Sequence, residues 1–267
     1  MTHPSNWRLP KGVTRGEWEY FHSVHVAQEF DDYFSSNELF AYDVSLILSK
    51  LDGHPFGKGG VVADMGCGTG RVLVPIVEAG YQGIAIDLSS HMLSVVAEKS
   101  AAKNLKIHRL QANLVELDGV HDAAVDHAIS MFSTLGMIVG GDHRQAALEH
   151  VSRILRPSGL FILHVHNRWF NLYDPGGPKW LLTNWFRARF VGDVELGDKY
   201  FDYRGVHNMY LHVFTCREIS RALRSAGFRI REMVPLEARR RRPLYAGWWC
   251  PNLRANGWII TAEKVTV

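Results

Sequence analysis

The sequence predicts an α/β fold built on a doubly wound, mostly parallel sheet of seven strands. Three observations predict it. Short apolar runs alternate with helical patterns through the first half of the chain, as they do in βαβ units. The first of these runs ends in a cluster of glycines, where a strand would turn into a helix. The 267 residues, 46% of them hydrophobic and 21% charged, suffice for one domain with a large core.

The first four strands are expected where apolar residues form short continuous runs. A helical pattern at 71–79 follows the first of them, and Pro75 within it means that this helix bends or begins later than its pattern. Ser89 is placed to cap the next helix. The four strands are expected at 61–65, 83–87, 105–110 and 123–130.

The second half of the chain completes the sheet. A helix begins near Asp142, and a turn at 157–159 leads into a fifth strand at 160–166. Residues 203–214 alternate loosely, as a strand would, and Thr215 is placed to cap a helix that ends before Gly227. The last two strands are expected at 228–234 and 258–262.

Two segments lie outside this alternation. Residues 17–51 are mostly helical in pattern and rich in Phe and Tyr, and they precede the first strand. Residues 167–202 are rich in aromatic residues, and we expect them to be either core or an apolar lid over a substrate. The single domain, 1–267, then comprises an N-terminal helical cap (1–55), a cofactor-binding core (56–166), an insertion that serves as substrate lid (167–214) and the C-terminal part of the sheet (215–267).

Composition excludes several classes of protein. Three cysteines without a CxxC pair argue for a reducing compartment and against a zinc ribbon or a disulfide framework. No secretory signal is evident at 1–12, and no stretch approaches the roughly 18 apolar residues of a membrane span. A net charge of +3 is too small to indicate a nucleic-acid partner by itself. We therefore expect a cytoplasmic protein with no membrane partner.

The strongest functional signal is the glycine loop at 61–72, which reads VVADMGCGTGRV. Glycine lets the backbone approach a ligand and adopt positive φ, and this loop would lie at the carboxyl ends of the strands, where open α/β sheets bind ligands. The loop is not a dinucleotide fingerprint, because Arg71 stands where the third glycine is required. Residues 53–59 are not a P-loop, because they are one residue short and lack Ser or Thr after Lys58.

Three further groups follow the ends of other strands. Asp87 ends the second strand 17 residues after Gly70, where a carboxylate can accept hydrogen bonds from both hydroxyls of a ribose. Asn113, just past the third strand, offers an amide to an adenine edge. Met131 and Phe132, at the end of the fourth strand, would wall the ligand.

These residues, in this order, resemble the class I S-adenosylmethionine-dependent methyltransferases over roughly 61–166. DMGCGTG looks like the D/E-x-G-x-G-x-G loop of that family, and ILRPSGLFIL resembles its LRPGG lead-in to a strand. TCREISRALRSAGF, at 215–228, resembles the helix-to-strand passage near the C-termini of these proteins. The resemblance departs at Asn113, where many relatives carry Asp.

The resemblance implies a Rossmann-like methyltransferase fold, S-adenosyl-L-methionine as cofactor and S-adenosyl-L-homocysteine as product, with no metal. It places the glycine loop around the methionine part of the cofactor, Asp87 on the ribose, and Leu88 and Met92 beside adenine. With the residues at the other strand ends, the expected cofactor-binding set is Asp64, Gly66, Cys67, Gly68, Gly70, Asp87, Leu88, Met92, Ala112, Asn113, Leu114, Met131 and Phe132.

One histidine is the candidate catalytic residue. Methyl transfer mainly requires that nucleophile, methyl carbon and sulfur are held in line, and a base is needed only if the acceptor arrives protonated. His164 and His166 both stand near the end of the fifth strand. His166 is nearer the expected acceptor mouth, where it could act as a base or contact the acceptor, with a structural hydrogen bond as the alternative. His212 has a weaker claim of the same kind.

The sequence leaves three functions open. The leading hypothesis is methyl transfer to a small-molecule acceptor by in-line displacement, with an anionic group of the acceptor bound by arginines. The four arginines at 239–242, near Trp248 and Trp249, suggest as an alternative an RNA-modifying or RNA-binding protein. Residues 130–133 lack the N/D-P-P-Y/F/W motif of amino-methylating DNA enzymes, which weighs against a nucleic-acid partner. The third hypothesis is a non-catalytic homologue that keeps the cofactor pocket.

Overall fold

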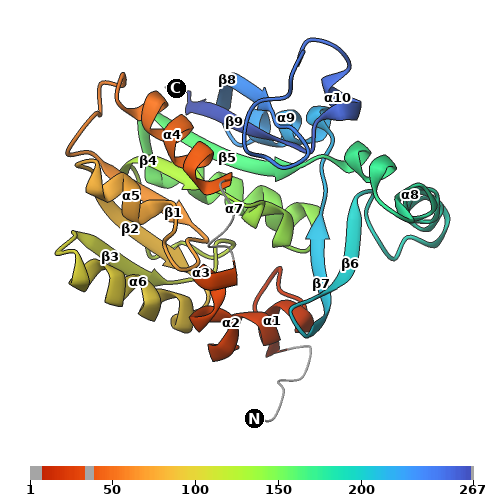
Figure 1. Ribbon diagram of the computed structural model, residues 1–267, viewed down its shortest axis with the longest axis horizontal. Coiled ribbons are helices and arrows are strands. Elements are labelled where there is room, and N and C mark those ends of the chain that lie inside the picture. Colours follow the sequence, from red (N-terminus) through yellow and green to blue (C-terminus); the bar gives the residue numbers. More distant parts are fainter. Residues whose placement is uncertain (1–7, 34–38, 266–267) are drawn as a thin grey trace.

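The computed structural model describes residues 8–33 and 39–265, and a seven-stranded sheet runs through its centre (Figure 1). The strand order is β3–β2–β1–β4–β5–β9–β8, and only β9 runs antiparallel to its neighbours. The sequence prediction of a mostly parallel, doubly wound sheet is confirmed. The strands are β1 (Val61–Met65), β2 (Gln82–Asp87), β3 (Ile107–Gln111), β4 (Val125–Ser130), β5 (Leu155–His166), β8 (Phe228–Pro235) and β9 (Gly257–Lys264).

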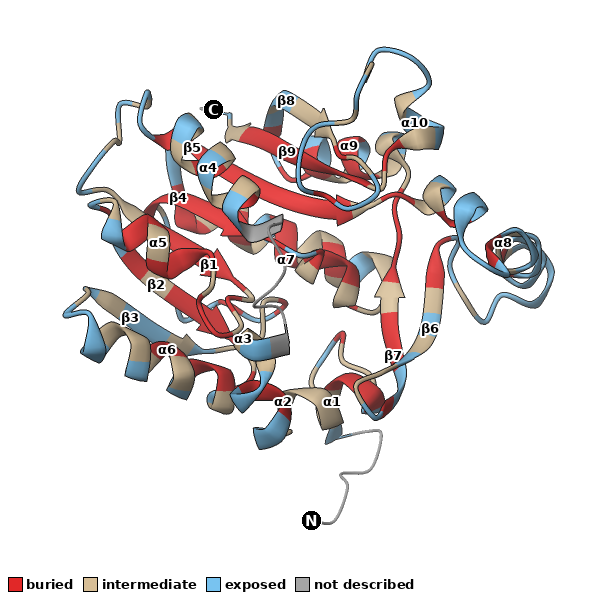
Figure 2. Ribbon diagram, in the orientation of Figure 1, coloured by how far each residue is buried: buried red, intermediate tan, exposed pale blue. Residues whose placement is uncertain are grey.

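Helices cover both faces of this sheet, so it lies between two apolar cores. One core joins the sheet to α7 and α9, and the other joins it to α4, α5 and α6. Because both faces are covered, the central strands are buried almost throughout (Figure 2). The five helices are α4 (Leu39–Leu51), α5 (Leu73–Glu78), α6 (Ser90–Ala102), α7 (Gly141–Ile154) and α9 (Cys216–Ser225).

Local signals in the sequence explain where several elements begin. Helix α5 starts at Leu73, which leaves Pro75 in the first turn, where a missing N–H costs no helical hydrogen bond. The Ser89 hydroxyl accepts a hydrogen bond from the Met92 N–H and caps α6. Strand β5 begins earlier than predicted, because Leu155 already pairs with Val125 ahead of an irregular step in the register.

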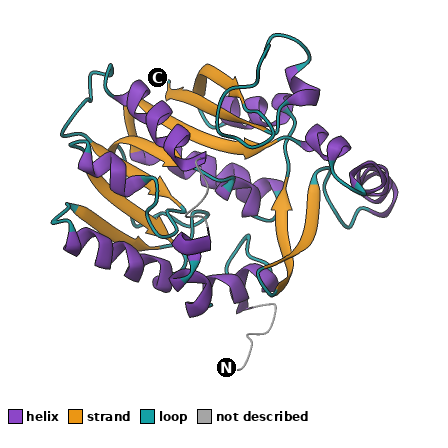
Figure 3. Cartoon of the chain, in the orientation of Figure 1, coloured by secondary structure: helices purple, strands orange, loops and turns teal. Residues whose placement is uncertain are grey.

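The segment after β5 forms a separate small unit. It contains a short 3-10 helix, η3 (Arg168–Tyr173), then α8 (Gly177–Phe186), a π-helical turn, η4 (Arg187–Val191), and the hairpin β6 (Asp198–Tyr203) and β7 (Val206–His212) (Figure 3). The aromatic side chains Trp185, Phe186 and Phe190 are at least half exposed. The expectation that this segment forms core is therefore wrong for α8 and η4. The buried Asn184 of α8 instead hydrogen-bonds the backbone of Gly197 and Asp198.

The N-terminal residues form short helices that precede the sheet. They are α1 (Arg15–Phe21), α2 (Val24–Gln28) and α3 (Phe30–Tyr33). Helix α1 packs closely on the hairpin: a Cβ on Gly16 would lie 2.6 Å from the carbonyl oxygens of His207 and Asn208. Among the described helices, none combines the length and apolar composition needed to cross a bilayer.

A buried charged network fixes the hairpin to α9. Nδ1 of His212 lies 2.8 Å from the Asp198 carboxylate, and its Nε2 lies 2.6 Å from Glu218. Burial alone would lower the pKa of His212, but its hydrogen bonds to the two carboxylates raise the pKa above its ordinary value. The Tyr210 hydroxyl donates a third hydrogen bond to Asp198, at 2.6 Å. Both ring nitrogens are thus engaged in the structural role that the sequence left as an alternative.

We expect His212→Gln to make the free energy of unfolding less dependent on pH. Since folding raises the pKa of His212, its stabilising effect is complete below about pH 6.5 and is lost as pH rises through the folded-state pKa. The melting temperature of the variant should therefore lie furthest below wild type in mildly acidic buffer. Thermal unfolding across neutral pH measures this, with the exposed His108→Gln as control. A difference from wild type that stays constant with pH would contradict the prediction.

Candidate functional site

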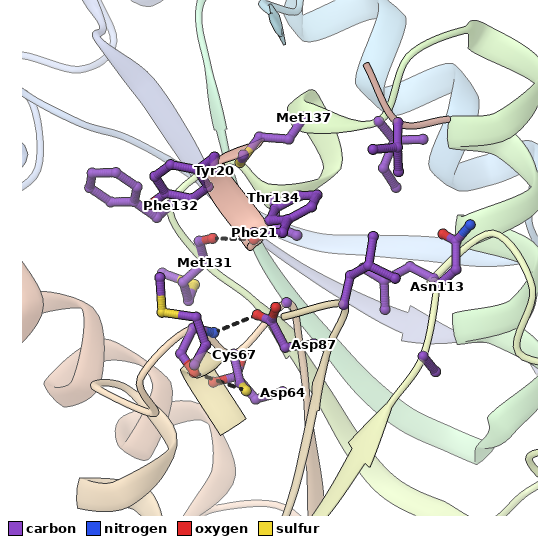
Figure 4. Close-up of a pocket in the computed structure, with 18 of the residues that line it drawn as sticks. Tyr20, Phe21, Asp64, Cys67, Asp87, Asn113, Met131, Phe132, Thr134 and Met137 are labelled. Atoms are coloured by element: carbon purple, nitrogen blue, oxygen red, sulfur yellow. Dashed lines mark hydrogen bonds between the residues drawn. The ribbon is translucent and has the colours of Figure 1, made fainter. Parts of the chain in front are cut away.

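A cavity lies at the carboxyl ends of β1, β2 and β4, where the sequence predicts a ligand (Figure 4). Twelve of the thirteen expected cofactor-binding residues line it. The exception is Gly70, whose position for a Cβ lies 3.1 Å from a Val96 methyl carbon. Gly70 therefore allows the loop to lie against α6. The twelve are Asp64, Gly66, Cys67, Gly68, Asp87, Leu88, Met92, Ala112, Asn113, Leu114, Met131 and Phe132.

Two glycines give the loop its shape at the cavity. Gly66 has φ +79°, and a Cβ there would lie 2.2 Å from the Thr134 side chain, so no larger residue fits. Gly68 has φ +52°, and nothing lies within 4 Å of its Cβ position. The backbone at Gly68 is thus left bare toward the cavity, which lets a ligand approach the main chain directly.

Asp87 stands at the end of β2 and ties the glycine loop to the start of α6. One carboxylate oxygen accepts from the Gly68 N–H and the other from the Ser89 N–H, each at 2.8 Å. Burial raises the pKa of Asp87, and these backbone N–H groups oppose that shift. Because each oxygen keeps a further lone pair, the carboxylate can also accept from two neighbouring hydroxyls of a ligand.

Asp64, at the end of β1, is a buried carboxylate to which the described residues donate no hydrogen bond. Its exposed fraction is 3%, and within residues 8–33 and 39–265 no donor reaches either oxygen. Burial, reinforced by the negative charge of Asp87, raises the pKa of Asp64 to about 8. In the described part of the chain this carboxylate is left to a ligand or to solvent in the cavity for its hydrogen bonds.

Asn113 lies in the cavity wall, but its amide has protein partners. Nδ2 donates to the Lys11 carbonyl at 3.0 Å, and Oδ1 accepts from the Val115 N–H at 3.1 Å. The side chain therefore tethers the N-terminal segment near Gly12, which also lines the cavity. An adenine contact by this amide could use the second lone pair of Oδ1, whereas Nδ2 is shared between the Lys11 carbonyl and Glu116, at 3.5 Å. Figure 4 places it at the side of the cavity opposite Cys67.

The N-terminal helices cover the cavity. Tyr20, Phe21 and Phe30 line it, and Tyr20 and Phe21 lie across the cavity from Cys67 (Figure 4). The Phe21 carbonyl accepts from the Ser89 hydroxyl at 2.5 Å. The sequence predicts a helical cap at 1–55 but does not indicate which of its residues cover the cavity. The aromatic enrichment of 17–51 was the available signal; the facing contacts depend on the tertiary fold.

Asp31, on α3, fastens this cover to the loop. It accepts a hydrogen bond from the Thr69 hydroxyl at 2.7 Å and pairs with Lys99, and its Oδ1 lies 3.9 Å from Nε of Arg71. Lys99 also donates to the Thr69 carbonyl at 2.8 Å. One carboxylate thus connects the cover to both the glycine loop and α6.

We expect Asp31→Ala to release the cover and speed the dissociation of S-adenosylhomocysteine several-fold, up to about tenfold. The loss of three partners at once frees α3, whereas the walls formed by β1 and β2 stay intact. Stopped-flow displacement measures the rate, and Glu98→Gln, an exposed acid next to Lys99, is the matched control. An unchanged dissociation rate in Asp31→Ala would show that the contacts of Asp31 do not hold the cover.

His166 does not line the cavity. Its Nδ1 lies 3.3 Å from the Asn256 side-chain oxygen, and its ring lies 4.8 Å from that of His164. Burial, with the nearby positive charge of Arg240, lowers the pKa of His166 to about 3. An imidazole with so low a pKa is a weak proton acceptor at neutral pH. The geometry therefore fits a hydrogen-bonding role better than that of a base, and the catalytic assignment stays a prediction.

A polar cluster stands behind Phe132. Arg240 is 4% exposed, lies 3.3 Å from Asp43 and has its guanidinium 5.1 Å from the Phe132 ring. The remaining arginines of the 239–242 run lie on the surface, where Arg242 pairs with Glu237. The run is therefore not one continuous basic patch.

The insertion contributes no described residue to the cavity wall. All lining residues come from 12–30, 64–72, 87–92, 112–114 and 131–138. The lid role expected of 167–214 thus receives no support from the cavity, whose cover is formed by the N-terminal segment.

Comparisons with known proteins agree with this site. Residues 62–159 match a family described as a methyltransferase domain. The chain is similar to the ribosomal RNA small subunit methyltransferase C of Alcanivorax borkumensis, with 26% identity over 141 residues, 52% of this chain and 37% of that protein. The chain spans 49% and 43% of the length of two other curated relatives that it matches.

Solved structures share the fold. A SAM-dependent methyltransferase of Methanosarcina mazei aligns with a TM-score of 0.66 and 20% identity, over 83% of this chain and 98% of that one. A 1,6-didemethyltoxoflavin-N1-methyltransferase of Burkholderia thailandensis, solved with its substrate and S-adenosylhomocysteine, aligns with a TM-score of 0.60 and 20% identity, over 91% and 85% of the two chains.

The cofactor of this family is S-adenosylmethionine, and the residues present fit it. The donor-less Asp64 suits a cationic or N–H-bearing group, the two oxygens of Asp87 suit a pair of hydroxyls, and bare backbone at Gly68 allows close approach. The glycine loop, the acidic end of β2 and the strand order all match the family pattern. The match over residues 62–159 and the shared fold confirm the resemblance to the class I S-adenosylmethionine-dependent methyltransferases.

Proposed function

We propose that the protein transfers a methyl group from S-adenosylmethionine to a small-molecule acceptor. The observation that carries the proposal is Asp64, a buried carboxylate on the cavity wall that no described residue hydrogen-bonds. Together with Asp87 it gives the cavity two acids at the ends of adjacent strands. A neutral ligand would leave Asp64 either unpaired or protonated, whereas a cationic amino acid moiety satisfies it.

The cofactor, when bound, supplies an electrophilic methyl group on a sulfonium centre. The protein then has to hold the acceptor in line with it and to exclude water. Tyr20, Phe21 and Phe30 provide the apolar cover, and Met131 and Phe132 wall the end of β4. Asp87 fixes the glycine loop by accepting a hydrogen bond from the Gly68 N–H. Because the same carboxylate would bind the ribose, one side chain sets the orientation of both the loop and the sugar.

The wall of the cavity supports a small acceptor. Among its described residues Arg71 is the one cationic side chain, and Arg71 faces Asp31 and the Phe30 ring. A polynucleotide needs several phosphate contacts from Lys or Arg to be held in place. An apolar wall closed by aromatic side chains suits instead a compact acceptor that is buried during the reaction.

Two measurements test the proposal in order. Calorimetry with S-adenosylhomocysteine should show saturable binding. Release of S-adenosylhomocysteine from S-adenosylmethionine is then followed with a panel of phenols, N-heterocycles, thiols and carboxylic acids, with purified bulk RNA as a separate arm. Turnover with a member of the panel supports the proposal, and turnover with RNA alone overturns the small-molecule assignment.

Methylation of RNA is the second candidate, and the relative named as a ribosomal RNA methyltransferase favours it. The exposed arginines of 239–242 would supply its electrostatic contacts. RNA binding through them should weaken steeply as salt is raised. Binding of cofactor without turnover in either arm would favour the third hypothesis, a protein that keeps the cofactor pocket as a scaffold.

We further propose that the acceptor extends from the cavity toward the end of β5, where His166 contacts it through a hydrogen bond. His166→Ala should then raise the KM for the acceptor found in the panel while the affinity for S-adenosylhomocysteine stays unchanged, because the residue lies outside the cofactor cavity. A pH profile of kcat that is the same in wild type and variant would agree with a contact rather than a base, since its pKa of about 3 lies below the working range.

A further inference from the structure

Exposed apolar side chains are concentrated at one end of the molecule. Fourteen of the seventeen large apolar side chains that are exposed in the described part of the chain lie in 169–200 or 245–253. In these segments Tyr245, Trp248 and Leu182 are 88%, 85% and 67% exposed. Scattered exposed apolar residues are ordinary, whereas such a concentration marks an interaction surface.

Surface helices usually turn their apolar side chains toward the protein, but α8 and the turn η4 turn several of theirs outward. Asn184 faces the protein: its Nδ2 donates to the carbonyls of Glu195 and Asp198, and its Oδ1 accepts from the Gly197 N–H. Leu182, Trp185, Phe186 and Phe190, each at least half exposed, lie on the opposite side at helical spacing. Asn184, with the partly buried Trp180 and Leu181, therefore marks the inner side of the helix, and most of the residues of α8 are exposed (Figure 2).

The neighbouring elements extend this surface. Helix η3, which carries the exposed Leu172 and Tyr173, packs against both α8 and α10 (Pro251–Arg254) (Figure 1). The loop before α10 carries Trp248 and Trp249, both exposed. We call the exposed apolar residues of α8, η4, η3 and this loop the aromatic face.

The charges on this face select its partner. Residues 177–191 contain the exposed cations Lys179, Arg187 and Arg189 and no acid, and Arg187 pairs with Asp193 just beyond them. Exposed arginines at 239, 241 and 242 lie in the adjoining loop. Helices that lie in the interface of an anionic bilayer have this composition: they present Trp, Phe and Leu to the lipid and carry Lys and Arg beside them. Stacking on RNA bases would use the aromatic rings but would leave Leu172 and Leu182 in water.

We propose that the aromatic face binds the surface of an anionic lipid bilayer, in place of the absence of a membrane partner that the sequence led us to expect. Helix α8 and η4 lie along the interface, their apolar side chains reach below the headgroups, and the adjoining lysine and arginines contact lipid phosphates. This inference goes beyond the proposed function and does not depend on it, because the cavity and the aromatic face share no described residue.

Vesicle flotation with the full chain tests the proposal. Vesicles of phosphatidylcholine alone and of phosphatidylcholine with phosphatidylglycerol are compared at low and physiological salt. We expect binding to the anionic vesicles that weakens with salt, and a loss of about tenfold or more in L182S/F186S/F190S. V24S/V265S, which changes exposed apolar residues elsewhere, is the matched control. K179Q/R189Q should weaken only the binding to anionic vesicles, whereas R221Q/R224Q, on exposed arginines of α9, should not.

Three outcomes would overturn the proposal. The first is no flotation of the wild type with anionic vesicles at low salt. The second is equal flotation of the wild type and of L182S/F186S/F190S. The third is a wild-type dimer in analytical ultracentrifugation that becomes a monomer in L182S/F186S/F190S, since this face would then join two copies. Unchanged affinity for S-adenosylhomocysteine in every variant verifies that each has folded.

Discussion

Asp87→Ala is expected to weaken the binding of S-adenosylhomocysteine by about 10- to 100-fold. The carboxylate holds the Gly68 and Ser89 N–H groups at 2.8 Å, and in the proposed complex it also accepts from the ribose hydroxyls. Alanine removes the ligand contacts and leaves two buried N–H groups without acceptors, and each loss costs about 1–3 kcal/mol. Calorimetry measures the affinity, and thermal unfolding measures the accompanying loss of stability.

The conservative variant separates the contact from the fold. Asp87→Asn keeps an oxygen for one of the two N–H groups and should recover most of the melting temperature but little of the affinity, because its amide cannot accept from both hydroxyls. Asp122→Ala removes a side chain that is 78% exposed and paired with Arg153, and serves as control. Wild-type affinity in a folded Asp87→Ala would contradict the position assigned to the cofactor.

The walls of the cavity could be predicted from the sequence because they follow from local patterns. A glycine loop after an apolar run, and polar residues at the ends of successive strands, are readable along the chain. Parallel pairing then brings the ends together: Asp64 is in register with Ala85, two residues before Asp87. Twelve predicted residues share one cavity for this reason. Even so, the sequence did not reveal that Asn113 has protein partners for both its amide atoms.

The cover and the insertion could not be predicted, because they depend on contacts distant in sequence. Asp31 reaches Thr69 across 38 residues, and nothing in the local pattern of either signals the bond. For 167–202, aromatic content suggested burial, since large apolar side chains are usually inside. That inference fails for α8, where a single buried amide, Asn184, sets the orientation of the helix and turns the aromatic residues outward.

The affinity for S-adenosylhomocysteine is expected to rise with pH up to about 8. Burial and the charge of Asp87 raise the pKa of Asp64 to about 8, so in the free protein this carboxyl is protonated at neutral pH. A cationic group of the ligand favours the ionised form, so binding releases a proton. Affinity should therefore increase by up to tenfold per pH unit and level off above the pKa. Calorimetry in buffers of different ionisation enthalpy counts the proton.

Asp64→Asn tests whether Asp64 causes this pH dependence of affinity. The amide of the variant does not titrate, whereas the groups of the ligand still do. The variant should bind S-adenosylhomocysteine more weakly above pH 8, and the part of the pH dependence of affinity that is due to Asp64 should vanish.

The stability of the fold depends on pH in the opposite sense. The folded-state pKa of Asp64 exceeds its unfolded value, so the contribution of Asp64 to the free energy of unfolding is complete below about pH 4. That contribution is lost as pH rises through about 8. Wild type should thus lose stability relative to Asp64→Asn over the range in which it gains affinity. Equal slopes of affinity with pH in both proteins would mean that Asp64 does not face the cationic group, and the cofactor would then have to be placed differently in this cavity.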